Sequence, residues 1–429
     1  MAFLRVKKGS PLRGEIRVPG DKSMTHRAIL LGGMARGTTV IRGYLPSEDC
    51  ICTLRAIEAM GVKAEAEKVL TIRGEGMAGL KEPERVLDMG NSGTSIRLLT
   101  GLLSGLPFFS VMDGDDSLRK RPMGRVIEPL AKMGAEIRGR QNNRFAPIAI
   151  SGKKNLQGIQ YRLPMASAQV KSALLLAGLN AEGMTQIEEP LFSRDHTERM
   201  LWAFGARIEY SPCKASVRQS ELRGTEFDVP GDFSSAAFFI VAATLVKKSA
   251  LLIRDVGVNP TRTGLLNALN RMGGKIEVQN LRNWGGEPVA DLFVESADRL
   301  KSVEINGEEI PSMIDELPIL FIAASYAEGR SLISGAKELR VKESDRIAVM
   351  ARELKKMGVE IKEFSDGVEI GGREEYEGSH FLSDGDHRVA MSMTVAALAA
   401  EGESLIEGTE CINTSFPGFE SILKSVTII

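Results

Sequence analysis

Six short segments of this sequence place small and polar residues directly before an apolar stretch. They read GDKSMTHR (20–27), GNSGTSIR (90–97), ASAQVKS (166–172), GDFSSA (231–236), MIDELP (313–318) and DGDHRVAM (384–391). A helix that begins at such a segment offers unpaired backbone N–H groups and a partial positive charge, which together attract an anion. The segments therefore predict a binding site for an anionic small molecule.

Cations within these segments strengthen that prediction. A positive side chain is unfavourable at the start of a helix unless a nearby anion offsets it. Four such cations lie in or near the expected first turns: Lys22, Arg27, Arg97 and Arg388. The alternative is that the polar residues only cap helices, a role for which four acceptors are suitable: Asp21, Ser167, Asp232 and Asp386.

Arginine and lysine also gather in SLRKRPMGR (117–125), SRDHTERM (193–200) and LRVKESDR (339–346). Each cluster alone is typical of a solvated surface, but together with the donor-rich segments they favour a cleft for a multiply anionic ligand. Asp315 and Glu343 lie among these cations and are candidates for a general base and a general acid. As alternatives, Asp315 could cap a helix and Glu343 could form an ion pair.

The elements that must position these residues repeat along the chain. An apolar helical segment, a small or polar break and a β-type run recur at 28–41, 97–111, 173–187, 238–253, 320–333 and 395–406. Amphipathic helices that end in a small hinge follow in five cases, from Ala56, Pro129, Leu201, Asn267 and Arg352. The pattern predicts an α/β protein whose apolar helices are buried inside a lobe.

Two near-copies, VPGDKS (18–23) and VPGDFSSA (229–236), divide these repeats into two groups of three. An extended Val-Pro-Gly step suits a chain that crosses from one body to another. We expect one lobe at residues 21–230 and a second lobe at residues 1–20 plus 231–429. The two crossings would form a hinge near Gly20 and Pro230.

Composition excludes several classes of protein. The 429 residues include 55 Lys and Arg against 56 Asp and Glu, so no basic excess is present to hold a nucleic acid. The longest strongly apolar run, 236–246, is far shorter than the ~20 residues that span a membrane. The N-terminal MAFLRVKKGS lacks the apolar core of a signal peptide, so we expect a cytoplasmic protein. The 4 cysteines and 4 histidines have no metal-ligand spacing, which indicates that no metal is bound.

Eight blocks resemble the 5-enolpyruvylshikimate-3-phosphate (EPSP) synthase family, in the family's order from residue 19 to residue 419. They are PGDKSMTHR, GNSGTSIR, RKRPMGR, MASAQVKSALLLAGL, SRDHTERML, VKESDRIAVM, DHRVAM and SFPGF. The resemblance implies a two-lobed enolpyruvyl-transferase fold. Such a fold has six βαβαββ units, three per lobe, around parallel buried helices, and its lobes close on substrate.

The resemblance also implies a reaction. Members of the family transfer the enolpyruvyl group of phosphoenolpyruvate to the 5-hydroxyl of shikimate 3-phosphate and release phosphate, a step of the shikimate pathway to aromatic amino acids. Neither a metal nor an organic cofactor is needed. Glyphosate is a possible inhibitor: Gly93 matches the small residue linked to sensitivity, whereas the SAQVKS and SRDHTERML blocks resemble less sensitive members. We expect a monomer.

Matching positions carry the family's functional residues over to this chain. The resemblance implies shikimate 3-phosphate contacts for Lys22, Ser23, Arg27, Ser167, Gln169, Arg194, Asp315 and Lys342. It implies phosphoenolpyruvate contacts for Lys22, Asn91, Gly93, Arg121, Gln169, Arg346 and Arg388. Asp315 resembles the group that accepts the 5-hydroxyl proton, and Glu343 resembles the group that protonates the phosphoenolpyruvate methylene. Lys22 matches the family lysine that touches both substrates.

This chain departs from some members of the family in two places. No lysine precedes Phe416-Pro417, and Glu338-Leu339 stands where some members carry an asparagine. One alternative of the same fold is UDP-N-acetylglucosamine enolpyruvyl transferase, which normally has Lys-Asn in place of Lys22-Ser23 and a loop cysteine that residues 119–125 lack. The other is a non-catalytic anion-binding protein, which the presence of both Asp315 and Glu343 disfavours.

Overall fold

The computed structural model describes residues 2–427 and forms two compact units. Unit 1 comprises the described residues up to Pro19, Pro230–Arg282 and the described residues from Pro288 onward. Unit 2 comprises Gly20–Val229 and Asn283–Glu287. The sequence interpretation assigned residues 283–287 to the other lobe, but this turn packs with unit 2, where Glu287 pairs with His196. Flexing at a hinge stays a prediction.

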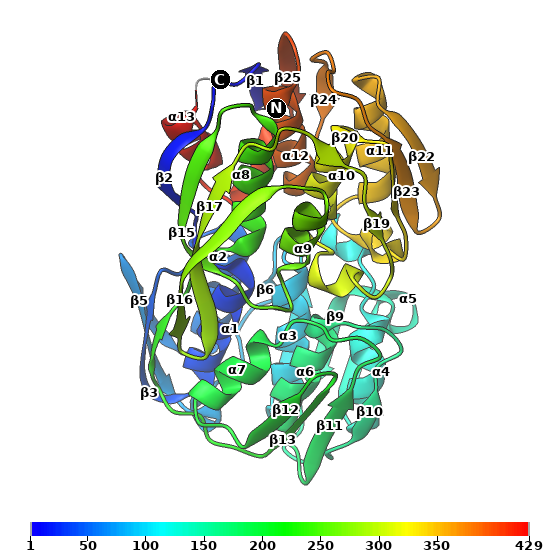
Figure 1. Ribbon diagram of the computed structural model, residues 1–429. Coiled ribbons are helices and arrows are strands. Elements are labelled where there is room, and N and C mark those ends of the chain that lie inside the picture. Colours follow the sequence, from blue (N-terminus) through cyan, green and yellow to red (C-terminus); the bar gives the residue numbers. More distant parts are fainter. Residues whose placement is uncertain (1, 428–429) are drawn as a thin grey trace. The chain divides into compact units, whose positions relative to one another are not determined.

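Three helices whose side chains are buried nearly all round form the centre of unit 2 (Figure 1): α1 (Lys22–Met34), α3 (Gly93–Ser104) and α6 (Ala168–Gly178). A Cβ at Gly101 of α3 would lie 2.1 Å from the carbonyl oxygen of Ala173 in α6, so only glycine fits there. Three amphipathic helices bury one face against this core: α2 (Glu48–Ala59), α4 (Gly124–Lys132) and α7 (His196–Ala203).

Three four-stranded sheets of one plan complete unit 2. Their strand orders are β14-β3-β5-β4, β6-β7-β9-β8 and β10-β11-β13-β12, and in each the first two strands are parallel and the other pairs antiparallel. The strands span β3 (Arg36–Arg42), β4 (Lys63–Ala66), β5 (Val69–Glu75), β6 (Leu87–Asp88), β7 (Phe109–Asp113), β8 (Glu136–Gly139), β9 (Phe145–Ser151), β10 (Gln160–Arg162), β11 (Met184–Glu188), β12 (Ile208–Ser211), β13 (Lys214–Arg218) and β14 (Glu226–Asp228). The repeat predicted from the sequence is therefore present three times.

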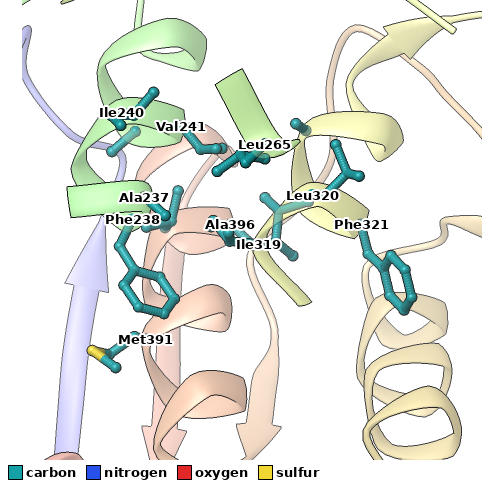
Figure 2. Packing of buried hydrophobic residues seen from close by; sticks show 14 of the residues in the cluster. Ala237, Phe238, Ile240, Val241, Leu265, Ile319, Leu320, Phe321, Met391 and Ala396 are labelled. Atoms are coloured by element: carbon teal, nitrogen blue, oxygen red, sulfur yellow. The ribbon is translucent and has the colours of Figure 1, made fainter. Parts of the chain in front are cut away.

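Unit 1 is built around three further buried helices: α8 (Phe233–Leu245), α10 (Leu317–Ser325) and α12 (His387–Ala399). Figure 2 shows side chains from these helices, among them Val241, Ile319 and Ala396, packed in a common core. Burying one such large apolar side chain contributes ~1.5–3 kcal/mol, so the helices and the residues at their starts are firmly held. Helices α9 (Gly264–Arg271), α11 (Arg346–Lys356) and α13 (Phe419–Val426) pack around them.

Two sheets of unit 1 have four strands, as in unit 2, whereas a third has three and a fourth only two. Their strand orders are β16-β17-β15-β2, β19-β21-β23-β22 and β1-β25-β24, together with the pair β18-β20. The strands span β1 (Phe3–Lys7), β2 (Arg13–Arg17), β15 (Ala250–Gly257), β16 (Lys275–Trp284), β17 (Glu287–Glu295), β18 (Leu300–Lys301), β19 (Glu304–Ile305), β20 (Ala327–Glu328), β21 (Arg330–Ile333), β22 (Glu360–Phe364), β23 (Gly367–Gly371), β24 (His380–Leu382) and β25 (Glu403–Glu407). The three-stranded sheet is completed by β1, which pairs antiparallel with β25 from Phe3 opposite Glu407.

The sixth repeat is thus closed by the two ends of the chain. Helix α13 is the sixth amphipathic helix among the described residues, and the sequence pattern did not show it because Thr427, not a glycine, follows its last residue. Strand β1 occupies the antiparallel position that β5 occupies beside β3 in the first repeat. Within residues 2–427, no helix has the length and apolar character needed to cross a membrane.

Candidate active site

Asp315 of unit 1 is surrounded by three of the predicted cations. It lies in the turn just before α10, and its Oδ1 is 3.5 Å from both Lys342 Nζ and Arg346 Nη1. Arg388 Nη1 donates to the Asp315 carbonyl oxygen at 3.0 Å. The alternative that Asp315 caps α10 is wrong, because Glu316 is the N-cap residue and no side-chain hydrogen bond caps that helix. A carboxylate among cations can act as a base that accepts a proton from a hydroxyl.

Glu343 joins the same cluster through an ion pair. Arg346 Nη2 donates to Glu343 Oε2 at 2.7 Å, so the ion pair that was the alternative for Glu343 is present. The Glu343 side chain is 19% exposed, whereas the Arg346 side chain is 1% exposed. Glu343 is therefore both oriented by Arg346 and accessible to a small molecule, and an ion pair does not preclude proton transfer.

Asp386 fixes the arginine at the centre of the cluster. It accepts from Arg346 Nε at 2.8 Å and from the Arg388 backbone N–H at 2.9 Å, so it also caps α12. Burial by itself would lower the pKa of the Arg346 guanidinium, but the Asp386 and Glu343 charges outweigh burial and raise it above its ordinary value. Burial would likewise raise the pKa of Asp386, yet the Arg346 charge holds that pKa below its usual range. The capping interpretation of Asp386 was correct but incomplete.

Glu316 is a buried acid that the sequence interpretation missed. Its Oε1 accepts from the Ser234 hydroxyl and lies 3.9 Å from Arg388 Nη1. Ser234 also accepts from Arg262 Nη2 at 2.7 Å, and the same nitrogen is 3.1 Å from the α8 cap Asp232. Glu316 at the start of α10 is thereby linked through Ser234 and Arg262 to Asp232 at the start of α8, and Arg388 lies next to Glu316.

The predicted residues of α1 in unit 2 have partners on neighbouring helices. Lys22, the first residue of α1, places its Nζ 3.1 Å from Asp49 Oδ2 at the start of α2. Arg27 donates from Nε to Thr197 Oγ1 at 2.6 Å and from Nη1 to the Ser23 carbonyl oxygen at 2.8 Å. Lys22 and Arg27 are therefore each held in place by identified acceptors. The Asp49 carboxylate supplies part of the negative charge that is expected near the cationic start of α1.

The start of α3 lies beside Arg121. The Arg121 Nη2 donates to Asn91 Oδ1, and Asn91 Nδ2 donates to Asp115 Oδ2 at 2.7 Å. Because a carboxylate can only accept, Asp115 fixes the orientation of the Asn91 amide, whose oxygen must then face Arg121. A Cβ at Gly93 would lie 3.1 Å from Arg97 Nη1 and 3.2 Å from Arg121 Nη1, so a glycine here allows two guanidiniums to approach α3.

Gln169 and Ser167 lie at the start of α6. Gln169 Oε1 accepts from Arg97 Nη1 at 2.5 Å, and its Nε2 donates to Thr94 Oγ1 at 3.0 Å. Ser167 caps the helix by accepting from the Val170 N–H at 3.4 Å. Arg97 was noted as a cation but not assigned to the site, although its bond to Gln169 places it among the predicted residues.

The predicted site residues thus fall into two groups, one in each unit. The unit 1 group is a single cluster formed by Asp315, Lys342, Glu343, Arg346 and Arg388. The unit 2 group lies at the starts of α1, α3 and α6, after the 3-10 helix Leu118–Lys120, and at Arg194, which lies between β11 and α7. Five of the six buried helices have a capping side chain: Asp21, Ser92, Ser167, Asp232 and Asp386. Among residues 2–427, no group of three His, Cys, Asp or Glu side chains could hold a metal ion.

Comparison with known proteins gives one consistent result. A family model described as EPSP synthase (3-phosphoshikimate 1-carboxyvinyltransferase) matches residues 6–423. A 3-phosphoshikimate 1-carboxyvinyltransferase of Geotalea uraniireducens is 55% identical over 100% of both chains. One of Desulforudis audaxviator is 52% identical over 99% of each chain.

Solved structures agree in fold. EPSP synthase from Acinetobacter baumannii superposes with a TM-score of 0.88 at 47% identity and covers 99% of this chain and 98% of its own. The enolpyruvyl transferase NikO from Streptomyces tendae has a TM-score of 0.80 at 17% identity over 99% and 97% of the two chains, a likeness of fold alone. The predicted enolpyruvyl-transferase fold is confirmed, and the chain belongs to the EPSP synthase family.

Proposed function

We infer that this enzyme transfers the enolpyruvyl group of phosphoenolpyruvate to the 5-hydroxyl of shikimate 3-phosphate and releases phosphate. It is a transferase of the shikimate pathway, which leads to aromatic amino acids. The observation that carries the inference is the Asp315 cluster in a member of the EPSP synthase family: one carboxylate beside three cations, with Glu343 bonded to one of them.

Shikimate 3-phosphate is an anion with a phosphate, a carboxylate and hydroxyl groups. We propose that it contacts Lys22, Ser23, Arg27, Ser167, Gln169, Arg194, Asp315 and Lys342. Arginine suits the phosphate because its planar fork offers two parallel donors. The partners of Arg27 on α6 and α7 support this assignment, since they leave its direction little freedom.

Phosphoenolpyruvate carries a carboxylate and a phosphate on adjacent atoms. We propose contacts from Lys22, Asn91, Gly93, Arg121, Gln169, Arg346 and Arg388. The reaction develops positive charge at C2, so the arginines must bind the two anionic groups without surrounding that carbon. The fixed amides of Asn91 and Gln169 and the absence of a side chain at Gly93 support such a precise placement.

Proton transfer accompanies both halves of the reaction. Asp315 accepts the proton of the 5-hydroxyl as its oxygen bonds to C2, and Glu343 gives a proton to the C3 methylene. In the resulting tetrahedral intermediate the bond from C2 to the phosphate oxygen breaks, and C3 returns a proton to Glu343 as the double bond forms again. The proton that Asp315 accepted leaves with the phosphate, so both carboxyl groups return to their starting states. Lys22, held by Asp49, supplies positive charge to both substrates as their anionic groups come together.

The test is release of inorganic phosphate from the purified chain with shikimate 3-phosphate and phosphoenolpyruvate, omitting each substrate in turn. Release that needs both substrates is expected. Release with UDP-N-acetylglucosamine in place of shikimate 3-phosphate would favour the other enolpyruvyl transferase. Saturable binding of both anions without release would identify a non-catalytic protein. A monomeric state, a cytoplasmic location and binding of glyphosate are further expectations that separate measurements must test.

A further inference from the structure

A buried lysine in unit 2 has no part in the reaction described above. Lys171, near the start of α6, places its Nζ 2.6 Å from Glu189 Oε1 and 2.7 Å from Glu198 Oε1. It also donates to the Ser193 carbonyl oxygen at 3.4 Å. The side chains of the lysine and both glutamates are at most 3% exposed. Burying three charges is costly even when they pair, so stability alone is a weak reason for such a cluster.

The three acceptors lie on both sides of Arg194. Glu189 follows β11, Ser193 directly precedes Arg194, and Glu198 is in the first turn of α7. Glu189 also accepts from the Ser193 hydroxyl at 2.5 Å and from the Ser193 N–H at 3.4 Å. These bonds hold Glu189 and Ser193 together on the N-terminal side of Arg194. The Lys171 ammonium group therefore links both ends of the segment from Glu189 to Glu198, which contains Arg194, to α6.

The next residue of α6 links the same segment to Arg27. The Ser172 and Thr197 hydroxyls are 2.6 Å apart, and Arg27 donates to Ser172 from Nη2 at 2.9 Å and to Thr197 from Nε. Displacement of the segment away from α6 would therefore disturb Thr197 together with Arg194. Both arginines are assigned to shikimate 3-phosphate, and neither is assigned to phosphoenolpyruvate.

The positive charge of Lys171 favours ion pairs with Glu189 and Glu198 that stay formed. Burial by itself would lower the pKa of Lys171, but Glu198 and Glu189 outweigh it and raise that pKa, so the ammonium stays charged. Burial raises the pKa of Glu198, whose Oε2 has no hydrogen-bond partner within the described residues. A methionine at this position would match the length of the lysine stem but would leave two buried carboxylates without a cation, which favours movement of the segment toward solvent.

We propose that Lys171 is a positioning residue: without touching substrate, it holds the segment from Glu189 to Glu198 so that Arg194 and Arg27 are set for the phosphate group of shikimate 3-phosphate. This role rests on the proposed function, since it assumes that these arginines bind that phosphate. It predicts that Lys171 governs how strongly the enzyme prefers shikimate 3-phosphate to shikimate, which lacks the phosphate.

The test compares Lys171→Met with the wild type by calorimetry and by kinetics. We expect the Kd and KM of shikimate 3-phosphate to rise at least about tenfold, the loss of one good charge-assisted contact. The KM of phosphoenolpyruvate and the weak affinity for shikimate should change less than about twofold. Leu176→Ala, which removes a buried apolar side chain from the same helix without touching the cluster, controls for general loss of stability and should keep the preference.

Glu189→Gln provides a second variant of unchanged shape in case Lys171→Met does not fold. Its amide can still accept from Lys171 but lacks the charge, so we expect a smaller loss of preference in the same direction. The proposal is overturned if the variants that fold keep the wild-type preference for shikimate 3-phosphate over shikimate. It is also overturned if the KM values of shikimate 3-phosphate and phosphoenolpyruvate rise by the same factor, as a general loss of stability in Leu176→Ala would cause. A wild type that binds shikimate 3-phosphate but releases no phosphate would contradict the proposed function alone, because the calorimetric comparison does not depend on turnover.

Discussion

Arg346 and Asp386 form a two-pronged pair in the interior of unit 1: Nε lies 2.8 Å from Oδ2, and Nη2 lies 3.2 Å from Oδ1. Both side chains are completely buried. The pairing fixes the guanidinium plane, and the remaining donors of Arg346 then reach Glu343 and Asp315. The direction of the arginine that is proposed to bind phosphoenolpyruvate is therefore set by a residue that also caps α12.

Asp386→Asn separates these two roles, because asparagine caps a helix as well as aspartate does but has no charge and only one acceptor oxygen. We expect the KM of phosphoenolpyruvate to rise about tenfold or more, with a near-unchanged KM for shikimate 3-phosphate. Steady-state kinetics measures both. Asp345→Asn is the matched control: Asp345 directly precedes Arg346 and caps α11, but its carboxylate accepts from the Ala348 N–H and from Arg340, not from the Arg346 guanidinium. Equal effects of the two variants would show that only helix capping matters.

Asp315→Asn removes the proposed base while preserving size. Turnover should fall by at least about a hundredfold, the usual contribution of a general base, with little change in the Kd of either substrate. Phosphate release and calorimetry measure the two quantities. Asp298→Asn, at an exposed position of the same unit, should behave as the wild type. Retained turnover in Asp315→Asn would remove this residue from the mechanism.

Glu343→Gln keeps an oxygen for Arg346 but has no proton of suitable acidity for carbon. Turnover should fall at least about a hundredfold. In heavy water, the wild type should place deuterium on the C3 carbon of product and of recovered phosphoenolpyruvate, because the methyl group of the intermediate can lose either isotope. Mass spectrometry of both compounds should find little deuterium with the variant. Wild-type incorporation by Glu343→Gln would assign the proton to another group.

Gly93→Ala introduces a methyl group 3.1 Å and 3.2 Å from the Nη1 atoms of Arg97 and Arg121. Both side chains must shift, so we expect the KM of phosphoenolpyruvate to rise about tenfold, equivalent to about 1.4 kcal/mol. The KM of shikimate 3-phosphate should stay the same. Gly124→Ala is the control, because the first residue of α4 has room for a Cβ, whose nearest neighbour is 3.7 Å away. A methyl group without effect at Gly93 would show that the arginines tolerate displacement.

His26→Gln tests a pH dependence of stability. Burial, and then the charges of Lys22 and Arg27, hold the pKa of His26 well below 6.5. The folded protein therefore binds fewer protons here than the unfolded chain, so the stabilising contribution is complete above about pH 6.5 and declines as the pH falls below it. Glutamine can replace the 2.7 Å bond to Thr53 but does not titrate. Urea unfolding between about pH 7.5 and pH 5 should show a shallower loss of stability for the variant. Parallel curves would contradict the prediction.

The repeated helices could be predicted from the sequence because each apolar segment and each glycine hinge is a local pattern. Partners that depend on the fold could not. Strand β1 pairs with β25 from the far end of the chain, and Asn283–Glu287 joins the opposite unit from its flanking strands. Neither relationship leaves a periodic signal in the sequence.

The candidate site was predicted to a similar extent. Asp315 and Arg388 stand in polar segments before apolar stretches and Glu343 in a cluster of cations, and the structure brings them together with Lys342 and Arg346. The roles of the residues that orient these groups were missed: Asp386 was identified only as a cap, and Lys171 looks like an ordinary residue of a helix start. Whether such a residue is buried, and what it faces, depends on other helices and not on its neighbours in the chain.

The pairing of β1 with β25 also orders events during synthesis. On the ribosome, Gly20–Val229 is made before the residues that follow it and can fold while those are still being made. The hydrogen bond between His196 and Glu287 forms only after Glu287 has been made. Strand β1 (Phe3–Lys7) has no partner strand until β25 (Glu403–Glu407) has been synthesised. The three-stranded sheet of unit 1 is therefore completed only after β25 has been made, and a chain lacking β25 would expose an unpaired edge of β1.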